Sequence, residues 1–322
     1  MTRVTAPSRL HFGLLSLPAA GSNRWPGIDG QPGLPVRHFG GVGLMVDRPG
    51  LAVSVERARD WSATGPHAER TLGFARQFVS ALSLAEQIPF HVTVEHAPPE
   101  HTGLGVGTQL GLAVAKAIAV ELGRPELATP ELAFCVGRGE RSAIGVHGFN
   151  RGGLIVEAGK RPDDAVSPLV AHVDFPSEWA VVLVAPPGST SWHGSRERQA
   201  FAKLAEVGPS PAETDVLCRL VLTGLLPAIA TRDLHAFGEA LYEFNARAGD
   251  AFAAVQGGRY AGPAVAACVA KLRMLGLTGV GQSSWGPSVF AIVDRHSVPK
   301  VLAQMPDAPA VVAGASRGAI VN

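Results

Sequence analysis

Apolar residues recur along this chain with two different periods, one typical of strands and one typical of helices. They alternate with small or polar residues at 51–55 and 91–95, which predicts two strands. Short runs rich in β-branched and other aliphatic residues predict further strands at 154–156, 170–175 and 180–185. Residues 71–84 instead form an amphipathic helical pattern. Strands and helices therefore mix throughout the first half.

The second half is richer in helical patterns. Residues 213–229, 233–249 and 263–275 predict three helices, and 288–293 predicts a strand before a short helix that starts at Ser297. In the first half, Thr129-Pro130-Glu131 has the hydroxyl cap and first-turn proline of a helix start. Mixed elements in both halves indicate an α+β protein with two lobes. We place the boundary after residue 178, which gives domains of residues 1–178 and 179–322.

Composition limits the classes of protein to which this chain can belong. It has 322 residues, of which 46% are hydrophobic and 17% charged, and this is enough apolar material for a large folded core. Its 28 Lys and Arg residues nearly balance 27 Asp and Glu residues, so nucleic acid is not expected as a partner. The three cysteines lie far apart and predict neither a zinc site nor a disulfide framework.

The apolar runs argue against a membrane location. The first residues lack the apolar core of a signal peptide, and other runs are shorter than the roughly 20 residues that cross a bilayer. We therefore expect a cytoplasmic protein without a membrane partner. Glycine and proline gather most densely in residues 18–41, which predicts a long functional or mobile loop.

Residues 98–109, Pro-Pro-Glu-His-Thr-Gly-Leu-Gly-Val-Gly-Thr-Gln, carry the clearest chemical signal. Three glycines at alternate positions allow positive φ angles and a close approach of the backbone to a ligand. A helical pattern follows at once and ends at Gly123. Such a turn presents free N–H groups and the positive end of the helix dipole, which suits phosphate or pyrophosphate. The pattern also fits a purely structural turn, since it is neither a Walker loop nor a complete dinucleotide motif.

Two more segments give this loop a context: residues 6–13, Ala-Pro-Ser-Arg-Leu-His-Phe-Gly, and residues 279–287, Gly-Val-Gly-Gln-Ser-Ser-Trp-Gly-Pro. Taken alone, the first fits a strand and the second a polar turn before a strand. In this order, the three segments resemble the three motifs of the GHMP kinase superfamily, which includes galactokinase, homoserine kinase and mevalonate kinase. The resemblance implies a GHMP-kinase-like fold, with an N-terminal lobe like domain 2 of ribosomal protein S5 and a ferredoxin-like C-terminal lobe.

Four segments narrow the resemblance: residues 8–15, 39–44, 103–109 and 281–287. Together they resemble the β-ribofuranosylaminobenzene 5′-phosphate synthase family, and Gln-Ser-Ser-Trp at 282–285 is the most specific match. The resemblance implies a transferase of methanopterin-type cofactor biosynthesis that joins phosphoribosyl pyrophosphate to 4-aminobenzoate or 4-hydroxybenzoate and releases carbon dioxide and pyrophosphate. It also implies Mg²⁺ with the pyrophosphate substrate, through unknown protein ligands, and a homodimer. At Ser16 the chain departs from archaeal members, which tend to have Asp there.

A missing carboxylate argues against kinase chemistry. GHMP kinases commonly carry an Asp in a segment that reads Arg-Ser-Ala-Ile-Gly at 141–145 here, and the Asp position falls on Gly145. A phosphoryl-transfer enzyme must position and activate a hydroxyl, and glycine cannot serve as the base. Transfer of a phosphoribosyl group to a ring carbon needs no such base, because positioning and electrostatics are its main requirements.

The expected chemistry assigns roles to residues in all three segments. The candidate catalytic residues are Arg9, His11 and Arg37, because guanidinium groups bind phosphate and carboxylate and His11 suits the 4-substituent of the ring. The candidate phosphate or pyrophosphate ligands are Gly103, Gly105, Gly107, Thr108, Gln109 and Arg141, with Arg138 as a further candidate. The candidate substrate-binding residues are Ser8, Gln282, Ser283, Ser284 and Trp285. His11 and Trp285 also fit structural roles, which are commoner for such residues.

Two other functions stay open at the level of sequence. One is an ATP-dependent small-molecule kinase that uses a different carboxylate, such as Glu140 or Asp47. The other is a non-catalytic ligand-binding protein that keeps only the fold. Substrate-dependent formation of ADP would favour the first, and donor binding without turnover would favour the second.

Overall fold

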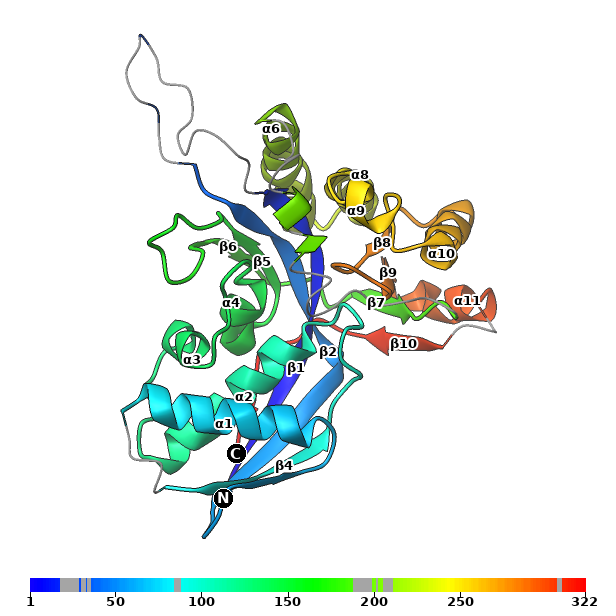
Figure 1. Cartoon of the computed structure of the whole chain (residues 1–322). Helices are drawn as coiled ribbons and strands as arrows, with labels where there is room; N and C mark the ends of the chain where they lie inside the picture. The colour runs from blue at the N-terminus through cyan, green and yellow to red at the C-terminus, as the bar shows by residue number, and fades with distance from the viewer. Residues whose placement is uncertain are drawn as a thin grey trace.

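The computed structural model describes residues 1–17, 29, 33, 36–83, 88–187, 199–200, 202–204, 211–305 and 309–322. Most of the predicted loop at 18–41 lies outside these described residues. The described chain forms two β-sheets with helices packed against them (Figure 1). The prediction of an α+β protein with two lobes is confirmed.

Two long antiparallel strands, β1 (Thr2–Ser16) and β2 (Phe39–Arg57), form the centre of the first sheet. The other strands of this sheet are β3 (Ser62–Thr64), β4 (Phe90–His96), β5 (Leu154–Glu157), β6 (Leu169–Val173) and β11 (Ile320–Val321). The strand order is β11-β1-β2-β4-β3, while β5 pairs with the first part of β2 and β6 pairs with β5. Because β11 pairs with β1, the end of the chain returns to the N-terminal lobe.

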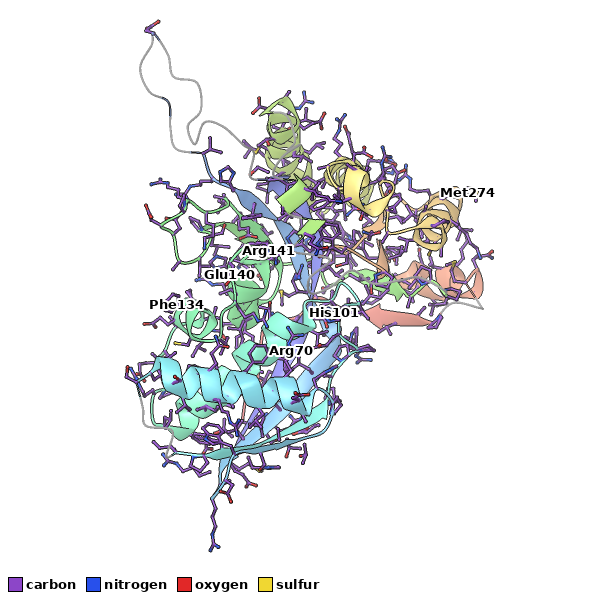
Figure 2. The ribbon with its side chains drawn as sticks, in the orientation of Figure 1. Arg70, His101, Phe134, Glu140, Arg141 and Met274 are labelled. Carbon is purple, nitrogen blue, oxygen red and sulfur yellow. The ribbon has the colours of Figure 1, made fainter. Side chains whose placement is uncertain are left out.

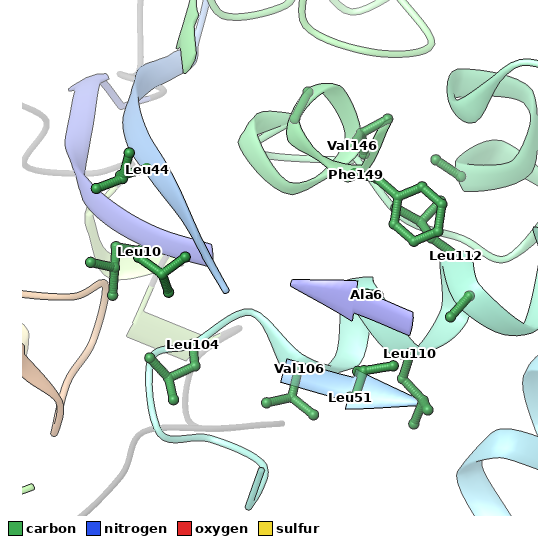
Figure 3. Close-up of a cluster of buried hydrophobic side chains, with 14 of the residues drawn as sticks. Ala6, Leu10, Leu44, Leu51, Leu104, Val106, Leu110, Leu112, Val146 and Phe149 are labelled. Carbon is green, nitrogen blue, oxygen red and sulfur yellow. The ribbon is translucent and has the colours of Figure 1, made fainter. Parts of the chain in front are cut away.

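The helices of the first lobe are α1 (Ala68–Ala81), α2 (Val106–Glu121), α3 (Thr129–Cys135) and α4 (Ile144–Arg151). The helix predicted after the glycine segment is confirmed as α2, which is buried along most of its length between the sheet and the other helices. A helix that is apolar all round belongs in such a core, and Figure 3 shows its Leu110 and Leu112 together with Leu10 and Phe149. One detail of the prediction is wrong: Thr129 is the first residue of α3, and Ala128 precedes it as the cap.

The second sheet contains β7 (Trp179–Val184), β8 (Gly279–Gln282), β9 (Val289–Asp294) and β10 (Ala310–Ala313), in the order β10-β7-β9-β8. Alternate residues of β7 and β9 point to opposite faces. One set, including Val181 and Phe290, joins the large core with α8 (Leu234–Asp250). The other set, including Val182 and Ala291, packs on α10 (Pro263–Met274) and α11 (Val298–Ala303).

The remaining helical segments are α6 (Pro211–Arg219), η1 (Leu220–Leu225), α7 (Leu226–Ala230), α9 (Ala253–Gln256) and η2 (Arg295–Ser297). The prediction of one regular helix over 213–229 is wrong, because η1 has π-helical turns between α6 and α7. Pro227, the second residue of α7, has no N–H for the regular bonding pattern. Within the described ranges, every helix is too short or too polar to cross a membrane.

Candidate active site

The glycine segment at 103–107 lies where several segments of the fold meet. Gly103 and Gly105 have φ angles of 83° and 70°, and Gly105 caps the start of α2. A Cβ at Gly105 would lie 2.8 Å from Nε of Arg9, and a Cβ at Gly107 would lie 2.6 Å from Nη2 of Arg70. The loop is therefore flanked by two guanidinium groups, and its backbone can be approached closely because side chains are absent.

Charged and polar side chains from other segments lie near this loop. In the view of Figure 2, Arg70 and His101 lie near the start of α2, and Glu140 and Arg141 lie in the loop before α4. Arg70 donates a 2.6 Å hydrogen bond to Glu100. Sequence reasoning missed Arg70, because an arginine on the polar face of an amphipathic helix gives no functional signal.

Arg138 is a partly buried arginine of the cavity wall. Its guanidinium lies over the ring of Phe74 at 4.8 Å, and its Nε is buried with no hydrogen-bond partner in the described part of the protein. Burial, and then the nearby charge of Arg70, lower its pKa. Arg138 stays cationic at neutral pH, since an arginine pKa lies far above that range. Such a group is well suited to an anionic ligand.

Ser283 ties the three sequence segments together. Its side chain is fully buried, its Oγ donates to the carbonyl of Gly103 at 2.7 Å, and the same atom accepts from the N–H of His11 at 3.0 Å. The N–H of Ser284 donates to the carbonyl of His11, and the N–H of Arg9 donates to the carbonyl of Leu104. The structure thus uses the polar atoms of Ser283 to hold the strand, the loop and the C-terminal turn in register.

Gln282 and Asn245 reinforce this junction. Asn245, on α8, donates to the carbonyls of Phe12 (2.6 Å) and Gln282 (2.9 Å). The side chain of Gln282 accepts from the N–H of Ala261 and donates to the carbonyl of Ser284. Sequence reasoning missed Asn245, which carries no motif of its own and acquires its role only when the two lobes come together.

A cavity of about 250 Å³ opens next to this junction, between the two lobes. The predicted site residues that line it are Arg9, His11, Thr108, Arg138, Arg141, Gln282, Ser284 and Trp285. Glu140, offered for a kinase, also lines it. The wall also contains residues that the sequence did not single out, including Phe12, Ser142, Phe252, Gln256, Arg259 and Tyr260. The cavity therefore joins parts of all three segments.

The cavity wall has an aromatic section. The rings of Phe252 and Trp285 meet edge to face with centroids 4.6 Å apart. Tyr260 lies in the same wall, and burial raises its pKa to about 12, so its hydroxyl stays protonated at neutral pH. Beside it, Arg259 is held by two hydrogen bonds to Asp250 of 2.8 and 2.9 Å. A wall lined by aromatic side chains suits an aromatic ligand.

Several predicted residues lie outside the cavity wall. Nη1 of Arg37 contacts Asp164 at 2.6 Å and the carbonyl of Gly159 at 3.1 Å. The buried hydroxyl of Ser8 donates to the carbonyl of Pro49, and Gln109, fully buried, donates to the carbonyl of Gly145. Asp47, the other carboxylate offered for a kinase, lines a second cavity, as does Arg295 of the C-terminal lobe. Gly145 lies in the first turn of α4.

His11 is buried in the cavity wall. Its Nε2 lies 3.0 Å from Oγ of Ser142. Burial, and then the charge of Arg9, lower the pKa of His11 well below its ordinary value. The ring is therefore neutral at neutral pH, where it can accept or donate a hydrogen bond but carries no charge.

This buried histidine predicts a loss of stability in mild acid. Because its pKa is lowered in the folded protein, the unfolded chain binds more protons below the ordinary value of 6.5. The stabilising contribution is complete above that value and is lost as the pH falls toward the lowered pKa. We expect a slope of up to about 1.4 kcal/mol per pH unit from this group, which His11→Asn removes. Urea melts of both proteins between about pH 7.5 and about pH 5.5 measure it, and parallel slopes would contradict the assignment.

The fold and the junction of three segments define a GHMP-type protein. The family model described as GHMP kinases, C terminal, matches residues 225–311. A mevalonate diphosphate decarboxylase from Enterococcus faecalis superposes with a TM-score of 0.67 at 16% identity, over 100% of this chain and 98% of that chain. A putative homoserine kinase from Listeria monocytogenes gives 0.63 at 17% identity, over 100% and 99%. At these identities the likeness shows the fold alone.

Curated relatives identify the particular family. The β-ribofuranosylphenol 5′-phosphate synthase of Methanothermobacter thermautotrophicus is 32% identical, with 99% of this chain and 98% of the relative covered. The synthase of the same name from Archaeoglobus fulgidus is also 32% identical, over 92% and 89%. This chain therefore belongs to the β-ribofuranosylphenol 5′-phosphate synthase family and is an enzyme with the GHMP fold. The synthase resemblance seen in the sequence is confirmed.

Proposed function

We propose that this enzyme transfers a 5-phosphoribosyl group from phosphoribosyl pyrophosphate to a ring carbon of 4-hydroxybenzoate, with 4-aminobenzoate as the second choice of acceptor. The name of the relatives supports the first choice, because a ribofuranosylphenol keeps a hydroxyl on the ring. The reaction belongs to the biosynthesis of methanopterin-type cofactors. We expect the enzyme to act as a homodimer.

The observation that carries the proposal is the presence of two different linings in one cavity. Arg9, Arg138 and Arg141 supply positive charge to the cavity, and Arg9 also lies against the glycine loop, which suits phosphate groups. Phe252 and Trp285 supply an aromatic section of the wall that suits a benzene ring. A site of this composition favours the meeting of a very anionic donor with an aromatic acceptor.

The bond changes of this reaction require no base from the protein. The ring carbon that bears the carboxylate attacks the anomeric carbon of ribose as the bond from that carbon to pyrophosphate breaks. The bond from the ring to the carboxylate then breaks, its electron pair restores the aromatic ring, and carbon dioxide leaves. Guanidinium groups and loop N–H groups stabilise the charge that collects on pyrophosphate, and the cavity holds the two reacting carbons close together.

Magnesium enters the proposal together with the donor. Among the described residues, no group of three or more His, Cys, Asp or Glu side chains is placed to hold a metal ion. Mg²⁺ commonly binds substrate phosphates with only one or two carboxylates from the protein. Glu140, in the cavity wall, is a carboxylate that fits this supporting role.

An assay of both products tests the proposal. With phosphoribosyl pyrophosphate, Mg²⁺ and carboxyl-labelled 4-hydroxybenzoate, we expect pyrophosphate and labelled carbon dioxide in equal molar amounts. Unsubstituted benzoate is the matched control and should react far more slowly, because it lacks the electron-donating group that drives the attack. Pyrophosphate without carbon dioxide would show donor hydrolysis and count against the proposal.

The same preparation tests the kinase alternative, which the position of Glu140 keeps relevant. Formation of ADP that depends on an added small-molecule alcohol would establish a kinase. We expect ATP to remain unconsumed, because the first turn of α4 has Gly145 and no carboxylate where GHMP kinases commonly have Asp.

A further inference from the structure

A buried carboxylate behind the cavity wall has no part in the reaction described above. Glu157 is the last residue of β5, and its side chain is 0% exposed. Its Oε1 accepts from the hydroxyl of Ser142 at 2.7 Å, and its Oε2 accepts from the N–H of Ala143 at 2.7 Å. Burial raises its pKa, and hydrogen bonds from Ser142, Ala143 and Ser167, followed by the charge of Arg9, oppose that rise. Because burying a carboxylate is costly, its place in the fold calls for a role.

The hydrogen bonds of Glu157 determine those of its neighbours. Ser142 has one hydroxyl proton, and that proton is donated to Glu157. Toward His11, Oγ of Ser142 must then accept, so Nε2 of His11 must carry the proton of the 3.0 Å contact. A neutral imidazole has one N–H, which leaves Nδ1 with a lone pair. Nδ1 has no hydrogen-bond partner among the described residues, and His11 lines the cavity.

We propose that Glu157 acts through Ser142 as a positioning residue that fixes His11 in the Nε2–H tautomer. Nδ1 is then the acceptor that the ring offers to the hydroxyl or amino group of a bound acceptor molecule. An O–H that donates to Nδ1 leaves more electron density on its oxygen, and this density strengthens the attack of the ring carbon. This catalytic consequence rests on the proposed function, whereas the tautomer follows from the hydrogen bonds that an ionised Glu157 accepts.

A structural alternative makes a different prediction. Glu157 also contacts the N–H of Ala143, the cap of α4, and an anion at a helix start is stabilising by itself. If capping were its whole role, removal of Glu157 would weaken the fold and leave the tautomer of His11 unchanged. The tautomer of His11 therefore distinguishes a positioning role of Glu157 from a capping role alone.

Glu157→Gln is the informative variant because it keeps the shape of the side chain. An amide has one acceptor and one donor group, so it cannot accept from both Ser142 and Ala143. With its oxygen kept for the N–H of Ala143, its NH₂ faces Ser142, whose proton then turns to His11 and moves the ring to the Nδ1–H tautomer. Ser142→Ala breaks the link at its middle, and Ser142→Thr keeps the hydroxyl as the matched control.

Long-range ¹H–¹⁵N spectra of the full-length protein labelled at histidine, with His11 signals assigned through His11→Asn, report the tautomer directly. We expect Nε2–H in the native protein and in Ser142→Thr, and a shift toward Nδ1–H in Glu157→Gln. Turnover should fall about ten- to hundredfold in kcat, with the donor KM nearly constant, in Glu157→Gln and Ser142→Ala. An Nδ1–H tautomer in the native protein overturns the inference. An unchanged tautomer in both Glu157→Gln and Ser142→Ala also overturns it. The spectra decide it even if no benzoate is turned over, which would overturn the proposed function instead.

Discussion

Replacing Arg9 by alanine is expected to lower kcat/KM with phosphoribosyl pyrophosphate about a thousandfold, since loss of one preorganised donor to a developing anion typically costs 10²–10³. Arg9 lies on β1, lines the cavity, and sits so close to the glycine loop that a Cβ at Gly105 would lie 2.8 Å from its Nε. This position next to the backbone of the loop fits a role in holding departing pyrophosphate. Steady-state kinetics and calorimetric titration of the donor measure the effect.

Arg3 provides the matched control on the same strand. Its guanidinium makes hydrogen bonds of 2.7, 2.8 and 3.0 Å to Glu95 at the surface, and it does not line the cavity. An exposed ion pair of this kind contributes little to stability and lies away from the cavity, so Arg3→Gln should keep kcat/KM within about twofold. Equal losses in the Arg3 and Arg9 variants would mean that the net charge of the lobe, and no specific contact of Arg9, supports activity.

Local features of the chain made part of this site predictable. The positive φ angles of Gly103 and Gly105 and the apolar helix after them follow from short-range rules, so sequence alone placed the loop and α2 correctly. Arg9 and His11 could be singled out because they belong to a recognisable segment. Their shared cavity, however, requires β1 to pass directly beside the loop, which only the folded sheet shows.

Other parts of the site have no signal in the sequence. Ser142 and Glu157 lie 15 positions apart, and their 2.7 Å contact arises because β5 runs beside the start of α4. A glutamate at the end of an apolar strand usually marks the strand's exit to solvent, whereas Glu157 is fully buried. The one available hint was that the charge directly follows three apolar residues of a buried run.

The C-terminal turn shows the opposite problem, a strong motif whose polar atoms are used inside the protein. Gln282 and Ser283 read equally well as ligands or as connectors, because both roles need short polar side chains near glycine. The structure pairs their side-chain atoms with Ala261, Gly103 and other backbone groups. The side chain of Ser283 therefore joins the two lobes, whereas that of Gln282 fixes the turn within the C-terminal lobe.

A single methyl group at Gly105 is expected to weaken binding of phosphoribosyl pyrophosphate about hundredfold. The reason is that it displaces Arg9, and loss of a preorganised hydrogen-bond donor typically costs 10²–10³. In Gly105→Ala the new Cβ would lie 2.8 Å from Nε and 3.1 Å from Cβ of Arg9, so the arginine must move. The residue also has a φ of 70°, where a side chain adds roughly 1–2 kcal/mol of strain. The variant should thus lose both donor affinity and a modest amount of stability.

Gly73→Ala is the control, because it makes the same glycine-to-alanine change at a site away from the glycine loop. Gly73 lies on α1, and a Cβ there meets nothing within 4 Å, so alanine should stabilise the protein by about 0.5–1 kcal/mol. Donor titration should give the native affinity for this variant. If Gly105→Ala also bound the donor with native affinity while its melting temperature fell, the glycine loop would be a structural turn and the pyrophosphate would have to bind away from it.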